Sequence, residues 1–178
     1  MQKGDRKERP VLVIPVHGLE EREYRFEFEP LAEELGLGDC YEGKLEISGM
    51  VSRVGSQFHV PGSVNGTRIG ECDRCLCSTS DRLTARFESV FSTGEGDPDE
   101  DGIIPLGGDG NDIVLDSEVQ QVMRLQIPMK NLCRDDCRGL CPSCGADLNV
   151  DECNCAPVDI DPRWSKLQGL LGDEPDSN

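Results

Sequence analysis

The chain has little of several features that mark common protein classes. Only 4% of its 178 residues are aromatic and 36% are hydrophobic, so we expect a modest core that gains from a metal or disulfide staple. No apolar run approaches the roughly 18–20 residues that a membrane span requires. Basic residues are also scarce, because 18 Lys and Arg oppose 35 Asp and Glu and leave a formal charge of -17.

This acidic balance indicates which partners suit the chain. A protein that follows a nucleic-acid backbone needs a basic face to displace counterions, and the charge of this chain argues against that role. Zinc held by four thiolates carries a net charge of about -2, so metal sites would make the molecule still more acidic. Basic proteins are the natural partners, ribosomal proteins among them, and RNA contact would be indirect.

The N-terminus lacks the features of an export signal. Residues 1–10 are charged and polar, so we expect them to be disordered, and Val11-Leu12-Val13-Ile14 is too short for the apolar region of a signal peptide. We therefore expect a cytoplasmic protein. Ten cysteines in that compartment are more typical of metal ligands or free thiols than of disulfides, with an exported disulfide scaffold as the alternative.

The pattern of residues 11–132 predicts an α+β domain with a few short helices and an antiparallel, β-rich centre. Strands are expected at Val11–Val16 and Tyr24–Phe28, and a short helix at 30–35 that Gly36 or Gly38 would end.

A longer β-rich region is expected from Lys44 to Phe91. A turn is predicted at Gly55-Ser56. A hairpin is predicted at Asn65-Gly66, because this dipeptide needs positive φ. A long final strand is predicted at 83–90. Since these strands follow one another in sequence, an antiparallel meander is the simplest arrangement.

The following residues predict a loop, a strand and a helix. The stretch 93–111 is rich in Gly, Asp, Glu and Pro, which indicates a mobile acidic loop. A strand is expected at 113–115. Asp116 or Ser117 would then cap a helix that continues through Leu125 and stops before Pro128.

Cysteines gather in two stretches of the chain. Cys72-Asp-Arg-Cys75 forms one pair, and six more follow between 133 and 155. Within them, Leu140-Cys141-Pro142-Ser143-Cys144-Gly145 has the form of a zinc knuckle, in which Gly145 can adopt positive φ. A tetrahedral structural zinc ion needs four such soft ligands. The segment 133–171 is therefore predicted to bind zinc, and 172–178 to be a disordered tail.

The preferred partition of the cysteines makes two structural zinc sites. Close spacing assigns one local site to the C-terminal group: Cys141, Cys144, Cys153 and Cys155. The other site would pin the end of the helix to the sheet through two distant pairs: Cys72, Cys75, Cys133 and Cys137. Four basic residues stand beside these ligands and could offset thiolate charge: Arg74, Lys130, Arg134 and Arg138. Cys40 and Cys77 remain as free thiols.

Other roles for the cysteines stay open. A single zinc ion, with the other thiols merely buried, is one alternative. Cys72-x-x-Cys75 could be a redox pair, although no βαβ pattern surrounds it. Catalytic zinc sites often include His and keep an open position, whereas His17 and His59 lie away from the cysteines in sequence. We expect structural zinc and no catalytic activity.

The order of these motifs resembles one protein family. Glu71-Cys72-Asp73-Arg74-Cys75-Leu76 precedes the acidic stretch, and Cys-x3-Cys-Arg-Gly-Leu-Cys-Pro-x-Cys-Gly begins at Cys133. Asp161-Pro162-Arg163-Trp164 lies near the end and suits either a contact surface or a turn whose Trp164 packs on the sheet. From about Val11 to Leu171, the chain resembles the YceD family.

This resemblance implies a non-enzymatic factor that supports accumulation of large-subunit ribosomal RNA and hence ribosome assembly. The implied partners are ribosomal or rRNA-processing proteins and pre-ribosomal particles, without a membrane or a small-molecule substrate. Two functions of other classes remain as alternatives: a zinc-ribbon nucleic-acid-binding protein, which steep salt dependence would reveal, and a thiol-disulfide oxidoreductase.

Overall fold

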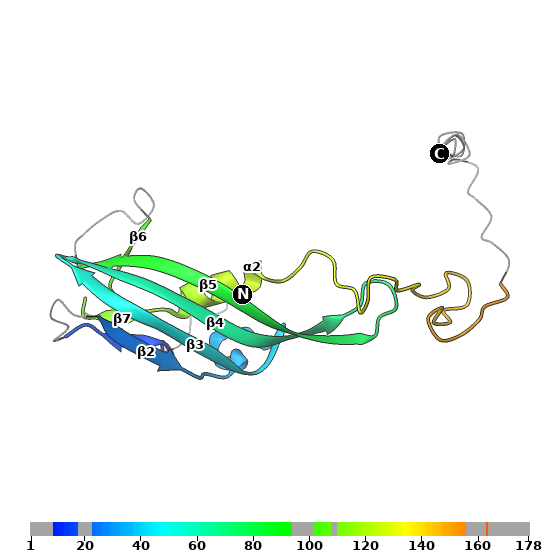
Figure 1. Cartoon of the computed structure of the whole chain (residues 1–178), viewed down its shortest axis with the longest axis horizontal. Helices are drawn as coiled ribbons and strands as arrows, with labels where there is room; N and C mark the ends of the chain where they lie inside the picture. The colour runs from blue at the N-terminus through cyan, green and yellow to red at the C-terminus, as the bar shows by residue number, and fades with distance from the viewer. Residues whose placement is uncertain (1–8, 18–22, 94–101, 108–109, 156–162, 164–178) are drawn as a thin grey trace, which may run out of the picture.

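A five-stranded sheet forms the body of the protein in the computed structural model, which describes residues 9–17, 23–93, 102–107, 110–155 and 163 (Figure 1). Its strands lie in the order β2 (Tyr24–Phe28), β3 (Tyr41–Val54), β4 (Gln57–Glu71), β5 (Ser78–Ser92) and β6 (Ile103–Pro105). The first four pair antiparallel with their sequence neighbours, which confirms the predicted meander. β6 departs from it, because it pairs parallel with β5 at Val90–Ser92.

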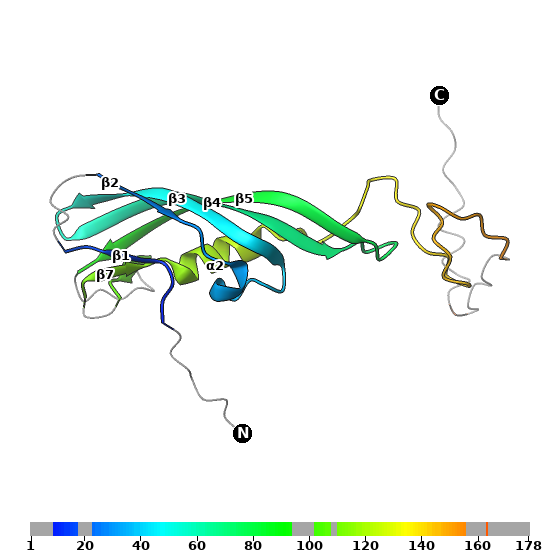
Figure 2. The ribbon, with the colours of Figure 1, turned by 90° about the horizontal axis from the view of Figure 1, so that it is seen from below.

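A second layer covers one face of this sheet. It contains a two-stranded sheet of β1 (Val13–Pro15) and β7 (Asp112–Val114), the 3-10 helix η1 (Ala32–Leu35) and the helix α2 (Asp116–Leu125). Figure 2 shows these elements on the same side of the sheet, with no described helix or strand on the other side. The main core lies between the two layers, and no described helix is long and apolar enough to cross a membrane.

Two glycines make room for aromatic rings on the covered face of the sheet. In the strand register Gly49 pairs with Phe26 on one side and with Gly62 on the other, and Gly62 pairs with Phe87. A Cβ at Gly62 would overlap the Phe87 ring, and one at Gly49 would overlap the Phe26 ring. Both rings are buried in the core. The glycines therefore create space for the aromatic side chains of the neighbouring strands β2 and β5.

The hairpin predicted at Asn65-Gly66 is wrong, because both residues lie in the middle of β4. Asn65 pairs with Thr84 of β5, whose hydroxyl donates to the Asn65 side chain at 2.6 Å. A Cβ at Gly66 would lie 2.6 Å from the Leu45 side chain, so this glycine serves close packing instead of a turn. The predicted turn at Gly55-Ser56 does connect β3 to β4, with Gly55 at φ 63°.

The stretch predicted as a mobile acidic loop contains regular structure where it is described. Ile103–Pro105 forms β6, and Ile104 packs against the core. Apolar contacts with β5 therefore outweigh the local Gly and Asp content. Residues 94–101 and 108–109 lie outside the described part of the chain, as do residues 1–8, 156–162 and 164–178, which include Trp164.

The predicted helices form with different ends or geometry. α2 spans Asp116–Leu125 and buries Val119 and Met123. Asp116 does not cap it, since its carboxylate accepts hydrogen bonds from the N–H groups of Val11 and Leu12 at 2.9 and 2.7 Å. The short helix near residue 32 is a single 3-10 turn, η1, which ends at Gly36 with φ 63°.

Candidate metal centres

The first cysteine motif forms the tip of the β4–β5 hairpin. Cys72 and Cys75 follow β4 directly, and Cys77 precedes β5. The turn closes with two backbone hydrogen bonds, in which Leu76 N–H donates to the Cys72 carbonyl at 2.9 Å and Cys72 N–H donates to the Cys77 carbonyl at 2.8 Å. Leu76 adopts φ 59°, the only described non-glycine residue with positive φ. We call this loop the first knuckle.

The second knuckle, from Cys141 to Ala146, repeats the first position by position. Gly145 N–H donates to the Cys141 carbonyl at 2.9 Å, and Cys141 N–H donates to the Ala146 carbonyl at 2.8 Å. Gly145 has φ 74° and occupies the place of Leu76. The sequence pattern predicted a knuckle only here, because Gly at this position is the recognisable signal and Leu76 hides it in the first motif.

The first knuckle contributes half of a four-sulfur cluster. The Sγ atoms of four cysteines lie within 4.8 Å of one another: Cys72, Cys75, Cys133 and Cys137. Cys72 Sγ is 3.8 Å from Cys137 Sγ, and Cys75 Sγ is 3.6 Å from Cys133 Sγ. Sulfur atoms at about 2.3 Å from a tetrahedral zinc ion are about 3.8 Å apart, so the spacing fits such an ion. Three of the four residues are buried.

The second knuckle contributes to another cluster that is more open to solvent. It brings together four more Sγ atoms within 4.8 Å: Cys141, Cys144, Cys153 and Cys155. Cys153 Sγ is 3.6 Å from Cys144 Sγ and 3.3 Å from Cys141 Sγ. Cys144 and Cys155 are exposed and only Cys141 is buried. The two clusters are the two groups that the sequence analysis proposed, and either could hold a metal ion.

Backbone N–H groups stabilise one thiolate in each cluster. Those of Cys133 and Cys75 lower the pKa of the Cys72 thiol to about 6. In the second cluster the N–H groups of Cys144 and Ser143 lower the pKa of Cys141 to about 6, and Ser143 N–H lies 3.4 Å from its sulfur. The pKa of a neighbouring thiol in the second cluster moves upward instead, because the hydrogen bond with Cys153 raises the pKa of Cys155 to about 12.

The first cluster joins the sheet to the segment that follows α2, and Asn131 strengthens this junction. Its side-chain amide donates to the Glu71 carbonyl at 2.7 Å and to the Thr79 hydroxyl at 2.8 Å. Its side-chain oxygen accepts a hydrogen bond from the buried Arg68 at 2.7 Å. The Asn131 N–H also donates to the Asp73 carboxylate at 2.6 Å, and the Asp73 N–H donates to the Asn131 carbonyl at 2.8 Å. These bonds hold the tip of the hairpin independently of the cysteines.

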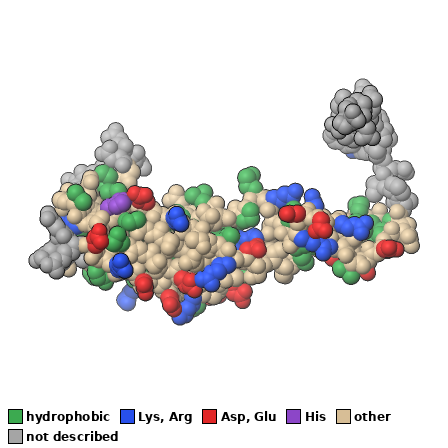
Figure 3. Space-filling view, viewed as in Figure 1, with side chains coloured by type: hydrophobic (Ala, Val, Ile, Leu, Met, Phe, Trp, Pro, Cys, Tyr) green, Lys and Arg blue, Asp and Glu red, His purple; other side chains and the backbone are tan. Residues whose placement is uncertain are grey.

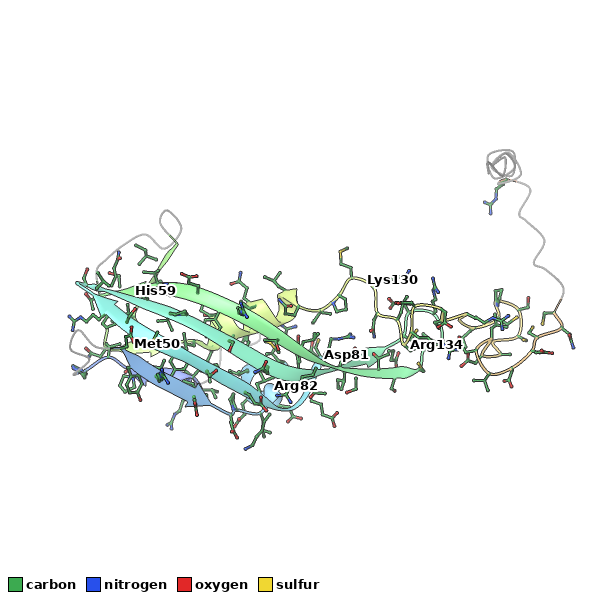
Figure 4. The ribbon with its side chains drawn as sticks, viewed as in Figure 1. Met50, His59, Asp81, Arg82, Lys130 and Arg134 are labelled. Atoms are coloured by element: carbon green, nitrogen blue, oxygen red, sulfur yellow. The ribbon has the colours of Figure 1, made fainter. Side chains whose placement is uncertain are left out.

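Two of the four basic residues predicted near the cysteines donate side-chain hydrogen bonds there. Arg74 donates to the Cys137 carbonyl at 2.6 Å, and Arg134 donates to the Asn149 side chain at 2.8 Å. Asn149 in turn donates to Cys137 Sγ at 3.5 Å. Figure 4 places Lys130 and Arg134 on the segment beside the hairpin tip.

The histidines lie apart from both clusters. His59 belongs to β4 and is paired with Glu88 at 2.7 Å, near the end of the sheet opposite the cysteines (Figure 4). His17 is exposed. Among the described residues, the only groups of three or more side chains suited to hold a metal ion are the two cysteine clusters. Neither cluster therefore has a histidine ligand.

Comparison with known proteins assigns the family. Residues 60–171 match the family model described as "Large ribosomal RNA subunit accumulation protein YceD". The chain belongs to the YceD family. No solved structure matches the chain.

The relatives of this chain include bacterial and plant proteins. An uncharacterized protein of Mycobacterium tuberculosis is 33% identical over 135 residues, which cover 75% of this chain and 65% of the relative. An uncharacterized protein of Mycobacterium leprae is 31% identical over 126 residues, which cover 68% of this chain and 56% of the relative. A relative of Arabidopsis thaliana is named "Large ribosomal RNA subunit accumulation protein YCED homolog 1, chloroplastic"; it is 23% identical over 71% of this chain and 48% of its own length. The chain thus matches less than two thirds of each of these relatives.

Proposed function

We propose that this protein is a non-enzymatic cytoplasmic factor that supports accumulation of large-subunit ribosomal RNA and ribosome assembly, with two structural zinc ions. The observation that carries the proposal is membership of the YceD family, because the family description and the name of the plant relative both refer to large ribosomal RNA subunit accumulation. The chain covers less than half of the plant relative, so the role is assigned here to the part that the two share.

The donor sets support zinc as the metal and a structural role for it. Each cluster supplies four sulfur atoms and no histidine or carboxylate, which is a soft donor set that suits zinc. Four protein ligands complete a tetrahedral shell and leave no position for water or a substrate. The first site would fasten the hairpin tip to the segment after α2, and the second would order the loop from Cys141 to Cys155. A zinc ion in either place shapes a surface instead of performing chemistry.

The charge of the molecule favours basic proteins as partners. Two zinc ions with four thiolates each would add about -4 to a chain that is already acidic. On the face shown in Figure 3, Lys and Arg side chains are interspersed with Asp and Glu and form no broad basic surface. We therefore expect ribosomal or rRNA-processing proteins as direct partners, with RNA contact through them.

A complementation experiment tests the role in rRNA accumulation. Cells that lack the gene should have a lower ratio of large-subunit to small-subunit rRNA, and the wild-type gene should restore it. A Cys72→Ser, Cys137→Ser double variant should restore it poorly, whereas Cys40→Ser, which changes a thiol outside both clusters, should restore it fully. An unchanged ratio in the deletion strain would refute the proposed role.

A pull-down with and without ribonuclease identifies the kind of partner. We expect basic ribosomal proteins to stay bound after ribonuclease treatment. If purified protein instead bound isolated rRNA with a steep salt dependence, the nucleic-acid-binding alternative would be correct. Reduction of insulin disulfides by the reduced, metal-free protein would instead establish the oxidoreductase alternative.

A further inference from the structure

We propose that Cys77 is an oxidation site at the first metal centre, where a peroxide converts Cys75 and Cys77 to a disulfide and so releases the metal. This inference rests on the proposed zinc occupancy of that centre. Cys77 is exposed and its Sγ lies 3.3 Å from Cys75 Sγ. A disulfide has a sulfur–sulfur length of about 2.05 Å, so a small movement of two neighbouring side chains would close the bond.

Cys77 is a fifth thiol beside a donor set that is already complete. The four sulfur atoms of the first cluster are those of Cys72, Cys75, Cys133 and Cys137, and Cys77 is not one of this group. In a zinc-loaded centre the four ligands would be occupied, and Cys72 and Cys137 are also shielded by burial. Cys77 would therefore be the exposed thiol at this centre that is not bound to metal, and an oxidant from solvent would react with it first.

The second knuckle shows that the turn does not require a thiol at this position. Ala146 takes the place of Cys77 there, and its carbonyl accepts the same hydrogen bond from the first cysteine of the knuckle. The Cys77 contribution to the turn is likewise its carbonyl, which Cys72 N–H contacts at 2.8 Å. The turn therefore needs the main chain of Cys77 and not its thiol, so the thiol can serve another role.

The reaction balances with a hydroperoxide as the named oxidant. Hydrogen peroxide oxidises the Cys77 thiol to a sulfenic acid and is reduced to water. The Cys75 sulfur, which would give up its bond to the metal, then attacks the sulfenic sulfur as a thiolate. The S–S bond forms, the S–O bond breaks, and hydroxide leaves and takes a proton to become a second water. Two electrons pass from two sulfurs to one peroxide, and a dithiol reductant reverses the change.

The consequence would be loss of one ligand at the junction between sheet and C-terminal segment. Cys75 cannot bind zinc as a thiolate while it is part of a disulfide, so three sulfur ligands would remain. Asn131 and Arg74 would still hold the segment through hydrogen bonds. Oxidation should therefore loosen the junction without unfolding the sheet.

Mass spectrometry of the full chain tests the inference directly. Cleavage after Arg74 and Arg82 yields a peptide that contains Cys75 and Cys77 and no other cysteine. After treatment of the reduced, zinc-loaded protein with hydrogen peroxide, this peptide should lose the mass of two hydrogen atoms and recover it with dithiothreitol. A disulfide from Cys75 to Cys133, or no disulfide at Cys77, would overturn the proposal.

Zinc release provides the second measurement. In a chain with Cys144→Ser and Cys155→Ser, the zinc counted belongs to the first centre. There, Cys77→Ala, which copies the second knuckle, should slow peroxide-driven zinc release about fivefold or more, and Cys77→Ser should do the same if the alanine variant fails to fold. Cys40→Ala, the matched thiol control, should leave the rate unchanged. Equal rates in the chains with and without Cys77 would refute the proposal.

The two proposals fail in different ways. Absence of zinc from freshly purified, reduced protein would refute the metal part of the proposed function, and the disulfide map would still decide whether Cys75 and Cys77 pair. Bound zinc without this disulfide would overturn the oxidation site alone.

Discussion

The sulfur atoms of Cys72 and Cys137 lie 3.8 Å apart, although 65 positions separate the two residues in the chain. Both side chains are buried, and with Cys75 they form a small core that is separate from the core of the sheet. Leu132 and Leu140 pack against this small core. Apolar contact at the end of the molecule that carries the cysteines is limited to this small core, and a bound metal would add to the hydrogen bonds of Asn131 and Arg74 that hold the junction.

Removal of the metal should loosen the cysteine-rich end and spare the sheet. Structural zinc contributes on the order of 10 kcal/mol in small folds, and residues 133–155 contain no described helix or strand that could replace it. After treatment with a strong chelator, hydrogen exchange should accelerate at residues 133–155. Amides in the centre of β4, such as Val64, should keep their protection. Unchanged exchange at residues 133–155 would contradict the structural role of the metal.

The two knuckles should respond differently to the same substitution. Gly145→Ala places a Cβ on a residue with φ 74°, which costs about 1 kcal/mol and should weaken zinc binding at the second centre about fivefold. Leu76→Ala should have little effect on the first centre, because Leu76 already carries a Cβ at φ 59° and is 60% exposed. Competition with a zinc chelator measures both affinities. Equal losses in the two variants would contradict this account of the turn.

Gly62→Ala should destabilise the sheet. The new methyl group would overlap the Phe87 ring and force that buried side chain out of place, at a cost of about 1–3 kcal/mol. Thermal unfolding should show the loss, and Phe87→Leu in the same chain should recover part of it by removing the ring. Ser63→Ala, which changes the next residue of β4, is the control and should unfold near the wild-type temperature. A Gly62→Ala variant as stable as the wild type would disprove the packing argument.

Zinc binding should release fewer than four protons per ion at pH 7.5. The pKa of Cys72 and that of Cys141 are lowered to about 6, so each cluster already holds one thiolate before metal binds, and about three protons remain to be displaced. Below pH 6 those thiols are protonated too, so the number should rise towards four and the zinc affinity should fall more steeply as pH decreases. Calorimetry in buffers of different ionisation enthalpy measures the proton count. A constant count across this pH range would show that the two thiols are not ionised early.

The sequence by itself determined most of the local structure. Alternating apolar residues identified β2 at Tyr24–Phe28, and helical spacing identified α2 up to Leu125, because burial of one face imposes a period on the chain. The close spacing of Cys141, Cys144, Cys153 and Cys155 also suggested that they form one group, since a tetrahedral ion accepts only nearby sulfur atoms. Only the tertiary structure decided the conformation of segments in which a local sequence signal competed with contacts from residues distant in the chain. Asn65 and Gly66 extend β4 because strands on both sides pair with this region, Asp116 binds the N-terminal segment instead of capping its helix, and β6 joins the edge of β5 in parallel. In each case the competing partner is distant in sequence, so its energy does not appear in any local pattern of residues.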